Sequence, residues 1–207
     1  MPSQRGDMAA NSVTGERAIV RLGVSDSGGK LLVSDVFVRP GGAVVGEHMH
    51  PGIDETFTIM SGTVGFRLNG REAIAVPGQR VHAPRGSLHD YWNAGDDEAH
   101  LLIEISPGTR FEEMAVNLFG LAMDGKTNAK GMPSLLQMAA LGREFDDVVR
   151  FARPPRVFQQ LMFALLGPIA KARGYIGNDP KYLNMTPQRV EPIGPWPLVA
   201  ESGPDAI

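Results

Sequence analysis

Three histidines and one glutamate have the residue types and spacing of a metal site. His48 and His50 lie two positions apart, Glu55 follows after a short Pro-Gly turn, and His89 lies further along the chain. Residues two apart on a β-strand point to the same side, so the two imidazoles can share one ion. Glu55 can open the neighbouring antiparallel strand and face the same interior. We expect these four side chains to bind one divalent metal ion per chain.

The donor set restricts the metal and its chemistry. Three neutral imidazoles and one carboxylate suit Fe, Mn, Ni, Co, Cu or Zn, and the set does not choose among them. Four protein ligands leave coordination positions open for water or substrate when the ion is five- or six-coordinate, and an open position distinguishes a catalytic site from a structural one. The chain has no cysteine, which removes thiolate ligands, disulfides and cysteine nucleophiles.

The four ligands fall within two longer motifs. The first is Gly42, five residues, His-x-His, four residues, Glu55, six residues and Gly62. The second is Gly78, five residues, Pro84, one residue, Gly86, two residues, His89, three residues and Asn93. With both motifs complete and in order, residues 17–106 resemble the cupin superfamily.

The resemblance implies a mainly β fold, the cupin double-stranded β-helix or jelly-roll barrel, with the metal inside it. It implies that His48, His50, Glu55 and His89 are the ligands. It further implies structural roles at the other motif positions, which are Gly42, Gly62, Gly78, Pro84, Gly86 and Asn93.

The surrounding sequence predicts the elements that must position this site. Short runs rich in β-branched residues, separated by turn signals, predict strands at 31–38, 55–60, 63–68, 72–76 and 99–105. Asn69-Gly70 between two of them predicts a tight hairpin. Beyond Pro107-Gly108 the apolar spacing becomes helical, at 111–119, 134–141 and 154–166, and we expect Pro168 to kink or end the third helix.

These patterns divide the chain into four segments. We expect a flexible N-terminal segment at 1–16, the barrel at 17–107, an α-helical C-terminal extension at 108–183 and a Pro-rich tail at 184–207. The helices must bury their apolar faces on the barrel, over its mouth or in a dimer. The third has an apolar run, Leu161–Leu166, flanked by arginines and lysine as in an interfacial membrane helix. That run is short and interrupted at Gly167-Pro168, which favours a core or dimer helix.

Strand parity also predicts pocket residues. Phe57 and Ile59 share the parity of Glu55, and Tyr91 shares that of His89, so all three should face the interior. The Tyr91 hydroxyl could orient a ligand or donate a proton, and otherwise Tyr91 is a core aromatic. His100 shares a strand face with Glu104, which is either a polar pocket wall or an exposed face.

The composition narrows the classes of function. The chain has 207 residues and a net charge of −3, so it offers no basic footprint for nucleic acid. It has no apolar signal-peptide core and no stretch long enough to span a membrane, so we expect a cytoplasmic protein. The predicted function is a metal-dependent enzyme acting on a small organic molecule, with a dioxygenase as the first subclass. The alternatives are a metal-dependent isomerase, lyase or decarboxylase, and a non-catalytic small-ligand binder or sensor. A homodimer is expected from the apolar helices and the resemblance.

Overall fold

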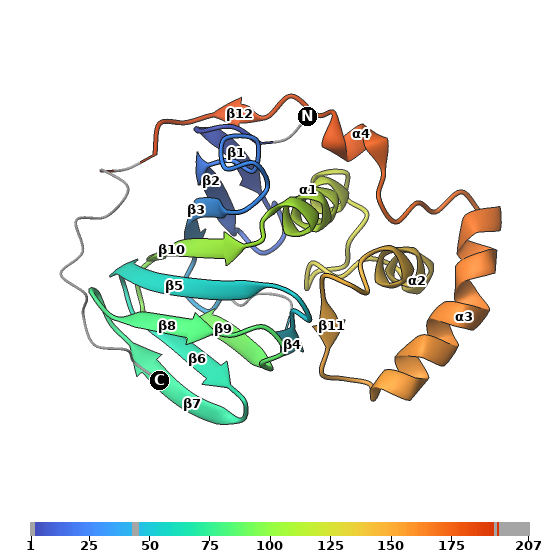
Figure 1. The fold of residues 1–207 in the computed structure, drawn as a ribbon, viewed down its shortest axis with the longest axis horizontal. Helices are drawn as coiled ribbons and strands as arrows, with labels where there is room; N and C mark the ends of the chain where they lie inside the picture. Colours follow the sequence, from blue (N-terminus) through green and yellow to red (C-terminus); the bar gives the residue numbers. More distant parts are fainter. Residues whose placement is uncertain (1–2, 43–45, 193, 195–207) are drawn as a thin grey trace.

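The computed structural model describes residues 3–42, 46–192 and 194. Two antiparallel sheets are built mainly from the N-terminal half of the chain, and the helices of the C-terminal half lie at one side of them (Figure 1). The strands are β1 (Asp7–Ala10), β2 (Arg17–Leu22), β3 (Leu32–Val38), β4 (His48–Met49), β5 (Asp54–Ser61), β6 (Val64–Leu68), β7 (Arg71–Ala75), β8 (Arg80–Ala83), β9 (His89–Asn93), β10 (Ala99–Ser106), β11 (Arg150–Phe151) and β12 (Gln188–Arg189). The helices are α1 (Thr109–Met123), α2 (Leu135–Glu144), α3 (Arg156–Ala172) and α4 (Pro180–Leu183).

The two sheets enclose a shared apolar core. One sheet has the order β12-β1-β2-β3-β10-β5-β8 and the other β11-β4-β9-β6-β7. The ring of Phe57 on the first sheet lies 5.3 Å from the rings of both Phe66 and Tyr91 on the second. Inward side chains of both sheets therefore interdigitate, as in a two-layer β-sandwich. This mainly β arrangement with C-terminal helices confirms the predicted fold class.

The β6–β7 hairpin turns where the sequence predicts it. Asn69 and Gly70 have φ of 49° and 80°, and Leu68 pairs with Arg71. Positive φ at both central residues is the type I′ geometry that matches the twist of the flanking strands. Asn tolerates this conformation better than most residues do, and the Asn69 side chain also accepts a hydrogen bond from the backbone N–H of Leu88, 19 positions along the chain.

Helices α1, α2 and α4 share the core of the sheets. Met114, Leu141, Phe145, Val148 and Tyr182 belong to the same buried cluster as the strand residues. Close approaches between helical elements occur at glycines, since a Cβ at Gly142 would lie 2.3 Å from the Phe163 ring. The extension is therefore packed onto the sheets. No helix in the described part of the chain has the length and apolarity needed to cross a membrane.

Two features differ from the sequence expectations. Residues 7–10, within the segment expected to be flexible, form β1, which pairs with β2 and with β12 of the Pro-rich tail. Residues 193 and 195–207 of that tail lie outside the described residues. The third helix neither ends at Pro168 nor stays within 154–166. Both Pro168 and Ala164, whose carbonyl loses its N–H partner, are exposed, so water can satisfy that carbonyl.

Candidate metal centre

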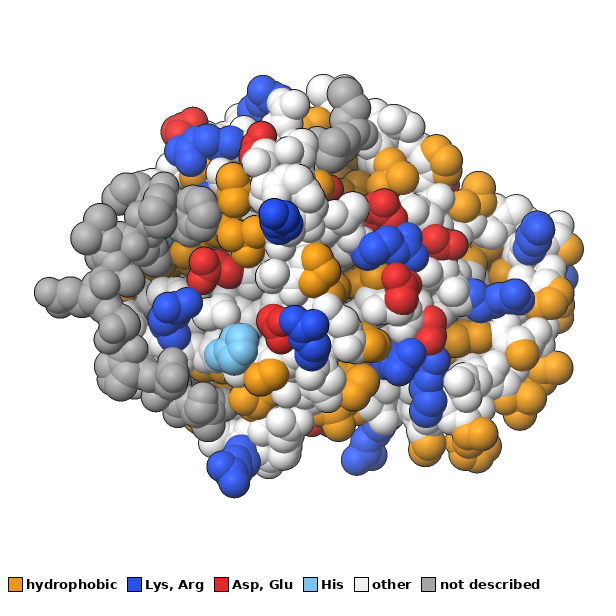
Figure 2. All heavy atoms as spheres, viewed as in Figure 1, with side chains coloured by type: hydrophobic (Ala, Val, Ile, Leu, Met, Phe, Trp, Pro, Cys, Tyr) orange, Lys and Arg blue, Asp and Glu red, His pale blue; other side chains and the backbone are white. Residues whose placement is uncertain are grey.

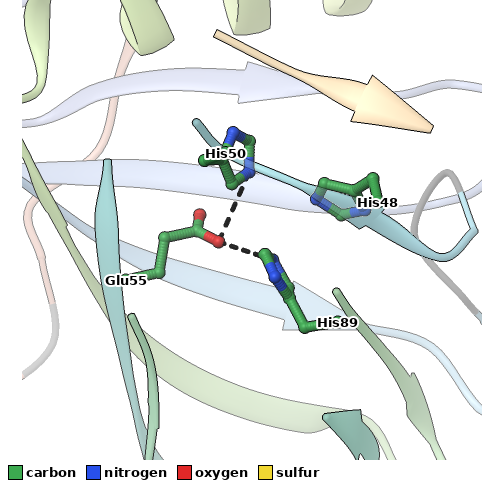
Figure 3. Close-up of side chains that lie close together, drawn as sticks. All are labelled: His48, His50, Glu55 and His89. Carbon is green, nitrogen blue, oxygen red and sulfur yellow. Dashed lines mark ion pairs between the residues drawn. The ribbon is translucent and has the colours of Figure 1, made fainter. Parts of the chain in front are cut away.

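The structure brings His48, His50, Glu55 and His89 together between the sheets (Figure 3). β4 carries His48 and pairs with β9 so that His48 lies opposite His89. His50 follows β4 directly, and Glu55 lies on β5 of the other sheet. The ligand atoms of all four residues lie within 4.8 Å of one another, and all four residues are buried. The clustering that the sequence predicts is therefore present.

The outer ring nitrogen of each histidine faces a backbone carbonyl. His48 Nδ1 lies 2.7 Å from the Gly46 oxygen, His50 Nδ1 lies 2.6 Å from the Val148 oxygen, and His89 Nδ1 lies 3.1 Å from the Ser87 oxygen. A carbonyl only accepts hydrogen bonds, so each Nδ1 must carry the proton. In the neutral rings, Nε2 then presents its lone pair, and the protein holds the tautomer that a metal requires.

The inward atoms have no hydrogen-bond partner. His50 Nε2, His89 Nε2 and Glu55 Oε2 are buried and unsatisfied among the described residues. Yet His89 Nε2 lies 2.7 Å from Glu55 Oε2, and His50 Nε2 lies 3.4 Å from the same oxygen. Two lone pairs at 2.7 Å repel unless a proton or a cation lies between them. Buried polar atoms normally have a hydrogen-bond partner, so the unpaired lone pairs of these atoms fit the binding of a metal ion.

Burial and mutual contacts shift the pKa values of all four side chains, in the direction that metal binding needs at His48, His50 and Glu55. Burial lowers the pKa of His48 to about 3, with His89 and His50 adding to the effect. Burial also lowers the pKa of His50. Burial opposes charge on His89 and Glu55 too, but the contact with Glu55 outweighs it at His89, and the three imidazoles together outweigh it at Glu55. The pKa of His89 is therefore raised and that of Glu55 is lowered to about 2. The carboxylate is ionised and His48 and His50 are neutral, as metal ligands must be.

The helical extension forms one wall of the site. β11 pairs with β4, which places Phe151 opposite His48, with the two ring centroids 6.5 Å apart. The Phe111 ring of α1 lies 5.4 Å from the His50 ring in an edge-on arrangement. Apolar rings around a polar cluster exclude water and lower the local dielectric, which strengthens interactions inside. The spacing of the sequence predicts helices here but not β11, which is only two residues long.

The predicted interior residues Phe57, Ile59 and Tyr91 are buried in the core cluster. The Phe57 ring lies 6.2 Å from the His89 ring and 5.3 Å from the Tyr91 ring. Their parity is as predicted, and their contact with a ligand stays a prediction.

Sequence reasoning missed Glu16. It lies just before β2 and shares the inward parity of Val20, and its carboxyl interacts with the Tyr91 hydroxyl. Burial raises the pKa of Glu16 to about 7, and the Tyr91 hydrogen bond only partly offsets this. The alternation of side chains along β2 could have indicated that Glu16 points inward, but residues 1–16 are expected to be flexible.

His100 lies on the other side of its strand, away from the ligand cluster. Its Nε2 lies 2.7 Å from Asp35 Oδ1, and its ring stacks on Phe37 at 4.4 Å. Asp35 also accepts hydrogen bonds from Arg21 Nε at 2.7 Å and Arg21 Nη2 at 2.8 Å. The pocket-wall interpretation of His100 is corrected by strand parity, because Leu101 and Ile103 take the inward face. The exposed-face alternative fails as well, because His100 is buried.

The other motif residues shape the loops that hold the ligands. Gly62, Gly78 and Gly86 have φ of 82°, 88° and 81°, a region that disfavours other residues. The N–H of Gly86 donates to the His50 carbonyl at 2.8 Å, which ties the second motif to the first.

Gly42, Pro84 and Asn93 act through close packing and backbone bonds. The Asn93 side chain donates to the carbonyls of Val38 and Asp97, both at 2.7 Å. Its backbone N–H donates to the Gly42 carbonyl at 2.9 Å, and a Cβ at Gly42 would approach Val38 Cγ1 to 2.9 Å. The Pro84 carbonyl accepts from the Ser87 N–H at 3.0 Å, closing the turn before His89.

Comparison with known proteins places the β-rich half in a family. Residues 35–105 match the family described as "Cupin domain". The protein TT1209 from Thermus thermophilus is 30% identical, with a TM-score of 0.37 over 38% of this chain and 74% of that one. A sugar phosphate isomerase of the cupin superfamily from Silicibacter pomeroyi is 22% identical, with a TM-score of 0.42 over 48% and 70%.

A third solved structure, from Thermotoga maritima, is described as a "predicted oxalate decarboxylase". It is 23% identical, with a TM-score of 0.43 over 52% of this chain and 92% of that one. No curated protein matched the sequence. These similarities cover about half of this chain or less.

Proposed function

The chain belongs to the cupin superfamily through residues 35–105, and from this premise we propose that it is a metal-dependent enzyme acting on a small organic molecule inside the barrel. The observation that supports the proposal most directly is the 2.7 Å approach of His89 Nε2 to Glu55 Oε2, with both atoms buried and unsatisfied. The ligand set is His48, His50, Glu55 and His89. A resident divalent transition metal would supply Lewis-acid chemistry, polarising a bound oxygen and stabilising developing negative charge.

The chain's own residues prepare the site for this chemistry. The carbonyls of Gly46, Val148 and Ser87 orient the three imidazoles. Phe111 and Phe151 cover two of them with apolar surface. Preorganised ligands in a water-poor site lose no free energy to reorganisation during reaction, which is the main contribution a protein makes to such a centre.

A proton-transfer reaction is supported by Glu16 and Tyr91. A general acid or base works best when its pKa lies near the working pH, and the pKa of Glu16 is raised to about 7. The Glu16 carboxyl interacts with the Tyr91 hydroxyl, and Tyr91 lies two residues after His89 on the same inward face of β9. Glu16 can therefore give or take a proton during an isomerase, lyase or decarboxylase reaction. This favours that class over the dioxygenase, which remains the redox alternative.

Metal content tests the ligand assignment. Protein purified without metal-affinity resin is expected to contain one divalent transition metal ion per chain by elemental analysis. His48→Ala and His89→Ala should lose it. His82→Ala is the matched control, because His82 is exposed and contacts Thr56 instead of the cluster. Equal metal content in all four proteins would refute the assignment.

Reaction class is tested separately from metal binding. The protein is loaded with Fe(II) under anaerobic conditions and then exposed to oxygen in the presence of phenols or diketones as test substrates. If the chemistry is proton transfer, it should not consume oxygen with any of them. Proton exchange between solvent and sugar acids or keto acids, followed by NMR, should then depend on Glu16. Oxygen consumption with a panel member, unaffected by Glu16→Gln, would establish the dioxygenase alternative. The expected homodimer and a cytoplasmic location stay predictions.

A further inference from the structure

Helix α3 exposes a continuous apolar stripe on the side opposite its buried face. We define the α3 stripe as the five residues Val157, Phe158, Leu161, Leu165 and Ile169, each between 46% and 66% exposed. The residues buried on α3 are Gln159, Phe163, Gly167 and Ala170. At about 100° per residue, these two sets occupy opposite sides of the helix. The expectation that α3 is a core helix is thus met by one face only.

The charged side chains of α3 itself and of the segments directly before and after it are all positive. From residue 148 to residue 178 the chain has no Asp or Glu but has Arg150, Arg153, Arg156, Lys171 and Arg173. Arg150 and Arg156 pair with Asp146 beside the helix. In the described part of the chain no ion pair involves Arg153, Lys171 or Arg173. At 3.6 residues per turn, Lys171 and Arg173 fall on the two opposite edges of the stripe. In Figure 2, hydrophobic side chains with Lys and Arg beside them gather at the end where Figure 1 places α3.

We propose that the α3 stripe docks the protein on the surface of an anionic lipid bilayer. A helix lying in the membrane interface inserts its apolar face at the boundary of the acyl chains and places Lys and Arg among the headgroups. Anionic headgroups supply the counter-charges that Arg153, Lys171 and Arg173 lack within the described chain. The structure orients the stripe outward, while Phe163 and Gln159 anchor the opposite face of α3 to the rest of the protein.

A second copy of the chain is a poorer occupant of the stripe. In a two-fold pairing the same surface meets itself, so residue i of one copy contacts residue j of the other. Two α3 helices packed in either direction would bring the cations flanking each stripe together with no acidic side chain from residues 148–178 to neutralise them. Like charges at an interface oppose association. The charge pattern that disfavours a self-pair is the pattern that an anionic surface attracts.

Vesicle sedimentation with the full chain tests the proposal. The protein is expected to sediment with mixed phosphatidylcholine–phosphatidylglycerol vesicles and to stay in solution with pure phosphatidylcholine vesicles. Leu161→Gln/Leu165→Gln should abolish sedimentation. Lys171→Gln/Arg173→Gln should weaken it, by about fivefold for each cation removed at low salt, and should reduce its salt dependence. All four residues are exposed, so the fold should survive each change.

A matched control and a measurement of mass separate membrane docking from general apolar adhesion and from self-association. Ile74→Gln removes an equally exposed apolar side chain from β7, 54% exposed, and should leave sedimentation unchanged. Equal sedimentation of wild type with both vesicle types, or none with either, would overturn the proposal. So would light scattering that shows a dimer dissociated by Leu161→Gln/Leu165→Gln, since the stripe would then be a self-interface. Metal content is expected to be the same in all these variants, so this test does not depend on the proposed enzyme function.

Discussion

His50 Nδ1 lies 2.6 Å from the carbonyl oxygen of Val148, a contact that spans 98 positions of the sequence. Val148 is buried and precedes β11, so the segment linking α2 to α3 sets the orientation of a barrel histidine. Loss of a hydrogen-bond partner of this kind typically lowers metal affinity by about 10–100-fold. The helical extension is therefore part of the candidate metal centre as well as a packing layer.

The carbonyl contacts predict the tautomers of two imidazoles. In metal-free protein near neutral pH, His48 and His50 are expected to be neutral rings protonated at Nδ1, because Nδ1 faces a carbonyl and burial lowers both pKa values. Long-range proton–nitrogen NMR correlations distinguish the two tautomers. His50→Gln should remove one set of signals and so assign it. Protonation at Nε2 in either ring would contradict the predicted orientation.

Metal removal is expected to destabilise the chain. A ligand that binds only the folded state stabilises it by roughly 3–4 kcal/mol at 100–1,000 times its Kd, which corresponds to roughly 5–15 °C in Tm for a chain of this size. A thermal melt with and without a chelator measures the difference. Glu55→Gln keeps the side-chain size but loses the anionic ligand, so its Tm should no longer respond to the chelator. His82→Ala should respond as wild type does, and a chelator effect retained by Glu55→Gln would count against Glu55 as a ligand.

The buried Arg21–Asp35–His100 network predicts a large effect of one isosteric change. Asp35→Asn removes the carboxylate charge from the fully buried Arg21–Asp35 ion pair and should lower the free energy of unfolding by roughly 3–5 kcal/mol. Urea unfolding followed by circular dichroism measures this. Glu72→Gln breaks the exposed Arg67–Glu72 pair and should change stability little. Similar midpoints for the two variants would mean that the network contributes no more than a surface pair.

Local pattern sufficed to predict the ligand cluster and the strands β3, β5, β6, β7 and β10. Strand parity places His48, Phe57 and Tyr91 inside, because side chains alternate strictly along a strand, and the Asn69-Gly70 turn follows from its φ requirements. Both depend on residues close in sequence. Tertiary pairing decides the parts that were missed. β1 joins β12 across about 180 positions, and β11 is a strand only because β4 lies beside it.

His100 and Pro168 show a second reason for the misses. The polarity of His100 suggests that it faces a pocket or solvent. Instead its ring is buried and pairs with the Asp35 carboxylate, which no local pattern indicates. A proline breaks a helix most readily where the carbonyl that it leaves without a hydrogen bond is buried. Pro168 lies on the exposed side of α3, where water can bond that carbonyl, so the helix continues. Both depend on what lies across space from the residue.

Glu16 predicts an unusual dependence of stability on pH. Its folded-state pKa is raised to about 7 by burial, whereas the unfolded chain has the ordinary value of 4.5. Between these values the folded chain keeps a proton that the unfolded chain has released, so this group makes stability fall as pH rises from about 4.5 to about 7. Above pH 7 the free energy of unfolding is lower by on the order of 3 kcal/mol because of this group.

Glu16→Gln removes that loss while keeping a polar partner for Tyr91. The variant should match wild type in urea unfolding near pH 4.5 and become more stable than wild type by up to about 3 kcal/mol at pH 8. Glu98→Gln, which removes a carboxyl from the exposed Arg17–Glu98 pair, should show no such pH-dependent gain. A constant difference between Glu16→Gln and wild type across the pH range would show that the Glu16 carboxyl does not change its protonation on folding. In that case Glu16 would also lose its support as the proton carrier of the proposed enzyme, while the assignment of the four metal ligands would be unaffected.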